Sequence, residues 1–312
     1  MTYNPNCMHV IFSSDDNYAQ HMGAAIQSLL DNNRDFEKIC VHIIENGIGN
    51  ENREKLEAIT AAFSNAELAW FDFSAWKERL QLDMSWPISV SSYARLFAGS
   101  MLRKDIPRVL YMDCDMIVCD SLRELWTADL GGKAVGAVQD FIGDETKAAV
   151  GLLPEEMYFN AGLLLINLGV WREEQVEKRC MTFLEERQGR VTHHDQGVLN
   201  GVLRNQWQRL PAACNLMTIH YMFDRRKLAK YFGDHAEFYT EQEVAEAKAK
   251  PVILHYTPSF TSRPWVKDCR HPLRGRYWAA VDKTPWRGAD KQTNGAKWYV
   301  RLIDWRYRNL PY

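Results

Sequence analysis

The first two thirds of the chain alternate short apolar runs with longer stretches in which apolar residues recur at helical spacing. The apolar runs at residues 9–13, 39–44 and 66–71 predict buried strands. Between them, apolar residues at every third or fourth position predict helices over 19–30 and 50–63. This order of strands and helices favours parallel strands joined by right-handed crossovers, and hence a layered α/β fold.

The rest of the chain extends this pattern and then loses it. Further strands are predicted over 108–112, 134–139, 162–167 and 252–255, and helices over 91–100, 170–187 and 194–203. From residue 263 onwards Pro, Trp and Arg interrupt any regular period, apart from a short helix predicted over 295–308. We therefore expect an α/β domain over residues 1–262 and an irregular or helical C-terminal extension over 263–312.

Composition is that of a globular protein and excludes several other classes. The 312 residues are 46% hydrophobic and 25% charged, which excludes a disordered chain, a collagen-like fibre and a small disulfide scaffold. Apolar runs such as residues 161–166 are too short to cross a bilayer, and we expect no signal peptide. The seven cysteines include no CxxC pair, so we expect reduced core thiols in a cytoplasmic protein and neither disulfides nor a zinc site.

Charge is divided unevenly along the chain, although the net charge is only −2. The C-terminal extension has twelve Lys and Arg against four Asp and Glu, together with nine Trp and Tyr. Trp and Tyr alternate with Lys and Arg between residues 297 and 308, a pattern that suits an anionic membrane interface. We expect a peripheral contact with the inner face of the cytoplasmic membrane there and no nucleic-acid partner. The alternative is that these tryptophans pack on the domain.

The strongest chemical signal is a pair of acidic residues, Asp113 and Asp115, between two apolar runs. Buried carboxylates are unfavourable unless they are paired or bound to a cation. Two acids one residue apart at the end of a strand suit a hard divalent cation with open positions for phosphate oxygens. A solvated turn between two strands is the alternative interpretation.

Taken alone, this Asp-x-Asp motif is compatible with two enzyme classes. A nucleotide-sugar glycosyltransferase uses such a motif to hold a metal ion on a diphosphate. A haloacid-dehalogenase-like phosphatase uses the first Asp as a nucleophile, but that motif normally follows the first strand of its domain. At least three predicted strands precede Asp113 here, so the position favours the glycosyltransferase.

Two more segments have polar residues where ligands bind α/β sheets. Ser13, Asp15 and Asn17 follow the first predicted strand, and ligands bind at the carboxyl ends of strands in open α/β sheets. They could bind a base or a ribose, or Asp15 or Asn17 could simply cap the next helix. Asn160 and Gly162 open a buried strand, where they allow a polar ligand to come close, or form an ordinary turn.

Two later segments are weaker signals. Asp195 and Gln196 lie at a predicted helix start, where they could bind a sugar or, in the case of Asp195, cap the helix. His255 ends an apolar strand and could be a third metal ligand, although a lone histidine at a strand end is usually structural. Arg263 follows before Pro and Trp.

Together and in this order, the segments resemble family 8 of the retaining glycosyltransferases, of the bacterial lipopolysaccharide galactosyl- and glucosyltransferase type and more distantly glycogenin. The resemblance covers roughly residues 8–270. The matching segments are FSSDDNYA at 12–19, SSYARL at 91–96, LYMDCDMIV at 110–118, YFNAGLLLINLGVWR at 158–172, HDQGVLNG at 194–201 and HY…RPW at 255–265. Six ordered motifs are a much more specific signal than any one of them.

The resemblance implies a GT-A fold, a UDP-hexose donor and a Mn²⁺ or Mg²⁺ ion. It implies that the metal ligands are Asp113, Asp115 and His255. At the donor sugar it implies hydrogen bonds from Asp140, Asn160, Gly162 and Asp195, with Gln196 near the anomeric carbon; of these, Asp140, Asp195 and Gln196 are the candidate catalytic residues. The residues that it implies along the rest of the donor are Ser13, Asp15, Asn17, Ile88, Arg95, Cys114, Ala161 and Arg263.

The implied reaction transfers galactose or glucose to a glycan or lipid-linked glycan such as lipopolysaccharide core. The alternative outside the enzymes is a nucleotide-sugar-binding protein without turnover. The chain departs from the family at two places: Arg263 stands where Lys is frequent, and Gly197 stands where many relatives have a second Asp. Because position 197 offers no carboxylate nucleophile, we expect the acceptor to attack from the front face of the donor.

Overall fold

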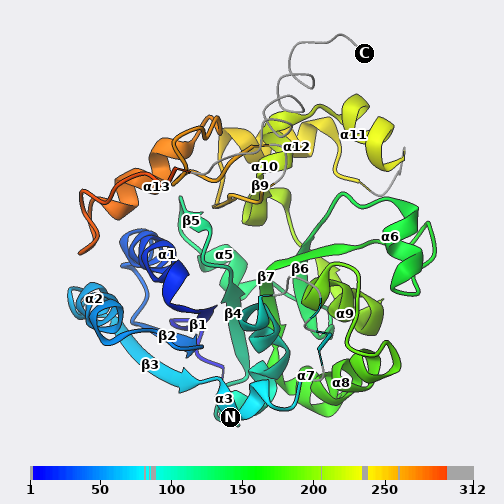
Figure 1. Ribbon diagram of the computed structural model, residues 1–312, viewed down its shortest axis with the longest axis horizontal. Coiled ribbons are helices and arrows are strands. Elements are labelled where there is room, and N and C mark those ends of the chain that lie inside the picture. Colours follow the sequence, from blue (N-terminus) through cyan, green and yellow to red (C-terminus); the bar gives the residue numbers. More distant parts are fainter. Residues whose placement is uncertain are drawn as a thin grey trace.

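A seven-stranded sheet in the order β3-β2-β1-β4-β7-β6-β8 crosses the middle of the molecule in a computed structural model (Figure 1). The structure describes residues 3–80, 82–83, 85, 89–204, 206–233, 238–258 and 261–293. Ile88, the helix predicted over 295–308 and the membrane contact predicted at 297–308 lie outside these residues. The strands are β1 (Cys7–Ser14), β2 (Lys38–Glu45), β3 (Ala66–Asp72), β4 (Arg108–Met112), β6 (Val135–Gln139), β7 (Phe159–Asn167) and β8 (Trp207–Arg209).

Strand direction brings distant parts of the sequence to one edge of this sheet. Strands β1 to β4 are parallel, which confirms the prediction from the alternating pattern for the first three of them. Strand β7 is antiparallel to both β4 and β6. Its amino end therefore meets the carboxyl end of β4, and the backbone N–H of Asp113 donates to the carbonyl of Gly162 at 2.8 Å.

A smaller sheet of three strands lies beside the carboxyl end of β4. Its strands are β5 (Met116–Val118), β9 (Leu216–Met217) and β10 (Ile253–His255). Strand β10 pairs antiparallel with β5, and this register sets His255 opposite Met116. His255 consequently lies next to Asp115, although 140 positions separate them in the chain.

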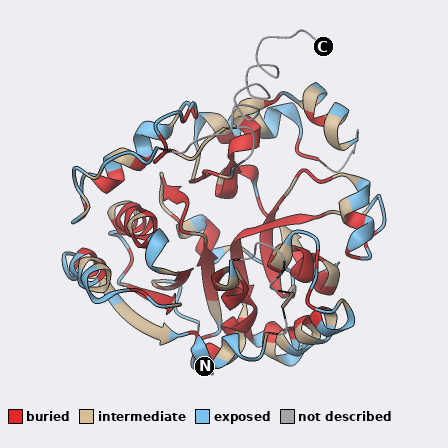
Figure 2. Ribbon diagram, in the orientation of Figure 1, coloured by how far each residue is buried: buried red, intermediate tan, exposed pale blue. Residues whose placement is uncertain are grey.

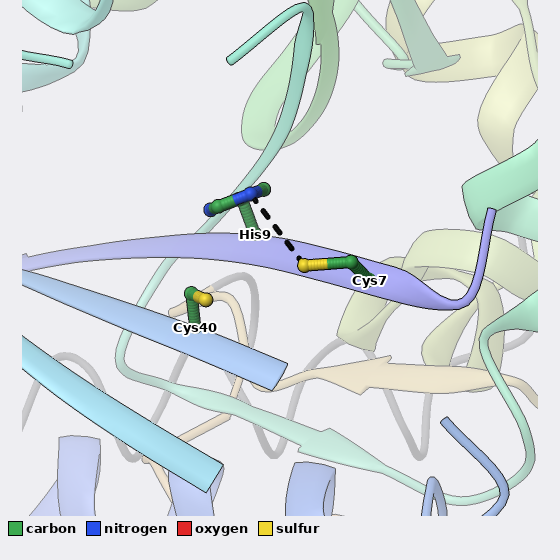
Figure 3. A group of neighbouring side chains, drawn as sticks. All are labelled: Cys7, His9 and Cys40. Carbon is green, nitrogen blue, oxygen red and sulfur yellow. Dashed lines mark hydrogen bonds between the residues drawn. The ribbon is translucent and has the colours of Figure 1, made fainter. Parts of the chain in front are cut away.

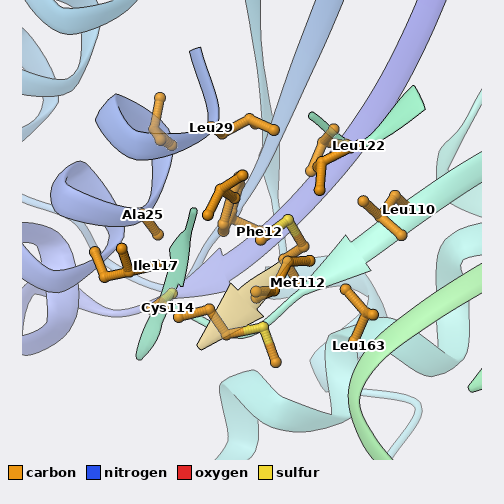
Figure 4. Packing of buried hydrophobic residues seen from close by; sticks show 14 of the residues in the cluster. Phe12, Ala25, Leu29, Leu110, Met112, Cys114, Ile117, Leu122 and Leu163 are labelled. Atoms are coloured by element: carbon orange, nitrogen blue, oxygen red, sulfur yellow. The ribbon is translucent and has the colours of Figure 1, made fainter. Parts of the chain in front are cut away.

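The core is divided between the two faces of the large sheet, which separates two layers of helices (Figure 2). Side chains alternate along each strand: Phe12 and Leu110 belong to one cluster, and Ile11 and Tyr111 to the other. Figure 4 shows the first cluster, where strand residues pack against Leu29 of a long helix. The helices on that face are α1 (Ala19–Asp31), α2 (Asn50–Ala61), α5 (Arg123–Thr127), α12 (Glu241–Ala249) and α13 (Arg274–Val281).

On the other face of the sheet, two of the predicted helices form differently from the prediction. The helix predicted over 91–100 is a 3₁₀ helix, η2 (Val90–Phe97), followed by the short α4 (Ala98–Met101). The helix predicted over 170–187 is split into α7 (Leu168–Glu173) and α8 (Val176–Glu186), because Gln175 between them has a left-handed φ of 50°. The third predicted helix on this face forms as α9 (His194–Leu203).

Several short elements were not predicted at all. Besides α5, α12, α13, β8 and β9, they are α3 (Ser74–Lys77), α6 (Asp144–Ala149), α10 (Thr218–Met222), α11 (Arg225–Phe232) and the 3₁₀ turns η1 (Asp16–Tyr18) and η3 (Ala212–Asn215). Most are a turn or two long, which is too short for a hydrophobic period to be visible. None of the helices in the described ranges has both the length and the apolar character that crossing a membrane requires.

The described part of the C-terminal extension packs on the helices of the first face. The Tyr277 hydroxyl in α13 lies 2.6 Å from Nδ1 of His21 in α1. Trp265 stacks on the His21 ring with the ring centres 3.7 Å apart. Through these contacts, residues 263–293 share the core that lies over β1.

Candidate active site

A cavity of about 580 Å³ opens at the edge of the sheet where β1 and β4 end. We call it the β1–β4 cavity. It is lined by Ser13, Ser14, Asp15, Asn17, Tyr18, Ser89, Ser91, Ser92, Arg95, Tyr111, Asp113, Cys114, Asp115 and Arg263. Its volume lies within the usual range for small-molecule sites, and its position obeys the rule that ligands bind at the carboxyl ends of strands.

Asp113 and Asp115 line this cavity, and His255 lies beside both of them, so the three predicted metal ligands come together. One ligand atom from each lies within 4.8 Å of the others. Nε2 of His255 is 3.2 Å from an oxygen of Asp115 and 3.9 Å from an oxygen of Asp113. Two carboxylates and an imidazole in one place are a suitable ligand set for a hard or borderline divalent cation.

Gly162 makes this convergence possible because it has no side chain. A Cβ atom at this position would lie 2.4 Å from Cε1 of His255 and 2.8 Å from Oδ2 of Asp113. Both distances are shorter than any contact that real Cβ atoms make. The glycine that opens β7 is therefore required by the two ligands beside it.

Arg95 is buried between two carboxylates at the back of the cavity. It donates to Asp113 at 2.7 Å and to Asp195 at 2.9 Å, and its guanidinium also contacts the carbonyl of Ala161. Burial alone lowers the pKa of Arg95, but the two carboxylates outweigh it and hold the pKa above its ordinary value. Burial raises the pKa of Asp113, and the Arg95 guanidinium offsets this only in part.

Arg263 reaches the same ligand group from the C-terminal extension. Its Nη1 atom lies 2.7 Å from Oδ2 of Asp115 and donates to the Tyr18 hydroxyl at 3.1 Å. Burial alone raises the pKa of Asp115, but Arg263 and His255 outweigh it and hold the pKa well below its usual range. Asp115 is therefore a carboxylate at neutral pH.

Asn215 orients His255, and the sequence reasoning missed this residue. Oδ1 of Asn215 lies 2.9 Å from Nδ1 of His255, and its Nδ2 donates to Oδ1 of Asn160 at 2.9 Å. Since the amide oxygen can only accept, this contact favours a proton on Nδ1 of His255 and turns Nε2 toward the carboxylates, where it could bind a metal ion. The only sequence signal was a polar residue directly before the strand Leu216–Met217.

A second polar group joins Asp140, Asn160 and Gln196. Nε2 of Gln196 donates to Asp140 at 3.0 Å, and Nδ2 of Asn160 donates to the same oxygen at 3.1 Å. Oε1 of Gln196 accepts from the backbone N–H of Ala161 at 3.0 Å. Through Asn160 and Asn215 this group is linked by hydrogen bonds to His255.

Asp195 is engaged inside the protein rather than at the helix end. One oxygen accepts from the Ser92 hydroxyl at 2.6 Å and the other from Arg95. The cap position of α9 belongs to His193, whose side chain makes no capping bond. His193 and His194 both have positive φ, 60° and 54°, so the chain turns sharply as it presents the start of α9.

The residues after β1 combine both interpretations that the sequence allowed. Asp15 accepts from the backbone N–H of Asn17 at 3.0 Å and so caps η1, yet both residues line the cavity. The Ser13 hydroxyl donates to the carbonyl of Ser91 at 2.8 Å, and the Cys114 thiol contacts the carbonyl of Ser13. Tyr18, to which no role was assigned from the sequence, closes this side of the cavity.

The charges around the cavity fit a cation. The carboxylates of Asp113, Asp115 and Asp195 outnumber the guanidinium groups of Arg95 and Arg263 that they face by one, and the carboxyl of Asp15 also lines the cavity. An oxygen, oxygen and imidazole ligand set suits Mn²⁺ or Mg²⁺ better than a thiophilic ion. The residues present therefore fit the metal that the sequence resemblance implied.

Comparison with known proteins agrees with this geometry. The family model described as "Glycosyl transferase family 8" matches residues 9–269, which is most of the chain. The chain belongs to glycosyltransferase family 8. This decides between the two enzyme classes that the Asp-x-Asp motif left open, in favour of the glycosyltransferase.

Two relatives of this glycosyltransferase match along most of their length. The chain is 27% identical to General stress protein A of Bacillus subtilis (strain 168), with 89% of this chain and 94% of the relative covered. It is 24% identical to Lipopolysaccharide 1,2-glucosyltransferase of Escherichia coli (strain K12), with 97% and 85% covered.

A solved structure supports the fold assignment. The structure of the galactosyltransferase LgtC in complex with donor and acceptor sugar analogs superposes with a TM-score of 0.70 at 27% identity. The match covers 89% of this chain and 96% of the other. The glycosyltransferase therefore has the GT-A fold that the sequence predicted.

Proposed function

We propose that this glycosyltransferase moves a hexose, galactose or glucose, from a UDP-sugar to a lipopolysaccharide-type glycan with the help of Mn²⁺ or Mg²⁺. The observation that carries the proposal is the convergence of Asp113, Asp115 and His255, of which the two aspartates line the β1–β4 cavity. The names of two relatives support the substrate class: one is a lipopolysaccharide glucosyltransferase, and the other is a galactosyltransferase solved with donor and acceptor analogs.

Breaking the bond between sugar and phosphate builds negative charge on the leaving UDP. A divalent cation held by Asp113, Asp115 and His255 would supply electrostatic stabilisation of that charge. Arg263 adds a fixed positive charge on the same wall, since its guanidinium already lies against Asp115. Arg95 keeps Asp113 and Asp195 in place by pairing with both.

The nucleotide end of the donor would lie over the end of β1. Asp15 and Asn17 expose polar atoms to the cavity there, and Ser13 lies beside them. Asp15 already accepts one backbone hydrogen bond, which fixes the direction of its carboxylate for contact with the base or ribose. The sugar end would then face Asp140, Asn160 and Gln196, whose side chains hold one another by hydrogen bonds.

The site favours attack from the front face of the donor. A Cβ atom at Gly197 would lie 1.9 Å from the carbonyl oxygen of Thr192, so this position has no room for a carboxylate side chain. Both oxygens of Asp195 are occupied, and those of Asp140 accept from Phe141, Asn160 and Gln196. Since Asp140 and Asp195 are engaged in this way and position 197 offers no carboxylate, we infer that the leaving phosphate oxygen would take the proton of the acceptor hydroxyl as the sugar becomes oxocarbenium-like.

Release of UDP from a panel of UDP-sugars, with Mn²⁺ and without acceptor, tests the donor and the metal together. We expect slow hydrolysis of one UDP-hexose that stops when EDTA is added. Release that persists in EDTA would contradict the metal requirement. Absence of release, followed by UDP binding in calorimetry and no transfer to lipopolysaccharide core, would instead indicate a binding protein without turnover.

The stereochemical proposal has its own test. The anomeric configuration of the product, read by NMR, should match that of the donor. Intact-protein mass spectrometry with a slowly reacting fluorinated donor should show no covalent sugar on the protein. A trapped adduct on any carboxylate would overturn front-face attack and leave the donor assignment intact.

We also propose that residues 297–308 bring the enzyme to an anionic membrane, while residues 263–293 complete the cavity through Arg263. The support is the alternation of aromatic and basic residues in that segment. Cosedimentation of the full chain with anionic vesicles should fall when Lys297, Arg301, Arg306 and Arg308 are replaced by Gln. Equal cosedimentation of both proteins would contradict a membrane contact at these residues.

A further inference from the structure

A second group of metal-binding side chains lies far from the catalytic residues, on the first two strands of the sheet. Cys7 and His9 are on β1, and Cys40 is on the neighbouring strand β2 (Figure 3). We propose that Cys7, His9 and Cys40 bind a thiophilic divalent cation, and that Zn²⁺ is the ion that fits them best.

Strand register brings these three residues together. In the parallel β1–β2 pair, His9 is the direct partner of Cys40. Because side chains alternate along a strand, Cys7 shares the face of His9 two positions earlier. The residues are 31 positions or more apart across the two strands, which is why the sequence shows no CxxC signal.

The distances are close to those of a tetrahedral zinc site. The ligand atoms of the three residues all lie within 4.8 Å of one another, and Sγ of Cys7 is 3.8 Å from Nε2 of His9. Zinc bonds of about 2.3 Å to sulfur and 2.0–2.1 Å to nitrogen set tetrahedral neighbours about 3.6–3.8 Å apart. The Cys7–His9 pair already has this spacing, and Cys40 needs a shift of about 1 Å or less.

His42 prepares the His9 ring for this role. Nδ1 of His9 lies 3.0 Å from Nε2 of His42, the residue two positions beyond Cys40 on β2. In its neutral form the His42 ring can accept this hydrogen bond through Nε2. With its own proton on Nδ1 donated to His42, His9 keeps an Nε2 lone pair on the side of Cys7.

Charge also favours a dication here. Two thiolates and a neutral imidazole around Zn²⁺ give a neutral centre, which suits a partly buried position. The charged neighbours balance one another, since Lys38 pairs with Glu67 and Arg103 with Asp105. Zinc binds cysteine as the thiolate, so the ion displaces the thiol protons as it binds.

The site is accessible but remote from the reaction. Cys7 and His9 are half-buried and Cys40 is 9% exposed, so an ion can enter from solvent and a water molecule can complete its coordination. The three ligands lie near the amino ends of β1 and β2, whereas the cavity lies at the carboxyl ends. A bound ion would link β1 to β2 and would take no part in sugar transfer.

Cobalt titration of the full chain tests this proposal. The protein is reduced, stripped with a chelator and titrated with Co²⁺, and we expect a near-ultraviolet thiolate-to-cobalt charge-transfer band that one equivalent of Zn²⁺ removes. Only sulfur ligands give this band, so Asp113, Asp115 and His255 cannot produce it. The matched control is Cys180→Ser, which removes a buried thiol of α8 and should keep the band at full strength.

Variants of the cluster distinguish the metal ligands from neighbouring residues that do not bind the ion. The band should disappear in Cys7→Ser and in Cys40→Ser, and His42→Phe should weaken Zn²⁺ binding about 10- to 100-fold. Circular dichroism shows whether each variant is folded, and UDP release should be unchanged in all three. No band in the unmodified protein, a band that survives in both serine variants, or a Cys7–Cys40 disulfide formed in place of metal binding would overturn the proposal.

Discussion

Two groups of potential metal ligands lie at opposite ends of the same sheet and differ in almost every physical property. At the carboxyl ends, Asp113, Asp115 and His255 offer two oxygens and a nitrogen. At the amino ends, Cys7, His9 and Cys40 offer two sulfurs and a nitrogen. Asp113 and Asp115 of the first group line a cavity of about 580 Å³, whereas the second group sits on two adjacent strands.

The two groups differ in how neighbouring side chains compensate their charge when no metal is bound. The carboxylate group is held by Arg95 and Arg263, so its negative charge is compensated by side chains that can also meet a phosphate. The thiol group is brought together by strand register, and its charged neighbours pair with one another, Lys38 with Glu67 and Arg103 with Asp105. The carboxylate group suits a cation that also binds a charged substrate, and the thiol group suits a cation that stabilises the fold.

The largest expected effect comes from neutralising one carboxylate of the cavity. Asp115→Asn keeps the shape of the side chain but removes the charge that faces His255 and Arg263. We expect the rate of Mn²⁺-dependent UDP release to fall on the order of 10²- to 10³-fold, the range found when one transition-state stabilising contact is lost.

The same substitution at Asp120 is the control for this variant. Asp120 is a surface carboxylate that pairs with Lys250 and lies outside the cavity. Asp120→Asn should keep the full rate. An Asp115→Asn enzyme with unchanged turnover would remove this carboxylate from the metal site and weaken the contrast between the two ligand groups.

A smaller but more local effect is expected from a methyl group at Gly162. In Gly162→Ala the new Cβ would meet His255 and Asp113, and these two ligands must move apart. A displacement near 1 Å at a reacting centre costs about 10²-fold in rate. Initial rates of UDP release at saturating donor measure this loss.

Gly275→Ala is the matched control, because a Cβ at this position in α13 meets no atom within 4 Å. It should keep the full rate of UDP release. Because alanine favours a helix more than glycine does, the variant should also unfold at a slightly higher temperature than the original chain. Equal rates in the two alanine variants would show that the ligands of the cavity tolerate displacement.

Asn215→Leu tests the orientation of His255 without touching a ligand. Loss of the amide oxygen frees the His255 ring to change tautomer, so we expect Mn²⁺ affinity to drop about 10- to 100-fold. The rate at saturating Mn²⁺ should recover most of its original value, since the three ligands remain. A variant that unfolds at a lower temperature but binds Mn²⁺ with unchanged affinity would mean that Asn215 contributes only to packing.

The sequence predicted those parts of the site that lie on single continuous segments. Asp113 and Asp115 follow one apolar strand, and their position between two apolar runs is enough to indicate a cation. The parallel order of the first three strands followed equally from alternating strand and helix patterns. In both cases the physical signal is local, so one stretch of sequence carries it.

Contacts made by pairing between distant strands were not predictable. Asn215 meets His255 only because β9 lies beside β10, and Cys40 meets His9 only through the register of β1 and β2. The antiparallel direction of β7, which carries Asn160 to the end of β4, has no local signal either. Hydrophobic periodicity indicates which residues are buried but not which residues they contact, so these neighbours become visible only in the folded chain.

The smallest expected effect is the one that separates the two ligand groups most cleanly. Zinc at ten times its dissociation constant should stabilise the folded chain by about 1.4 kcal/mol, or roughly 2 °C in melting temperature for a chain of this size. Cys40→Ser should lose this zinc-dependent shift and keep the full rate of UDP release. Asp115→Asn should lose the rate and keep the shift, because its cysteines are intact. A single variant that lost both would show that the two ends of the sheet are coupled, and the division between a structural ion and a reacting one would fail.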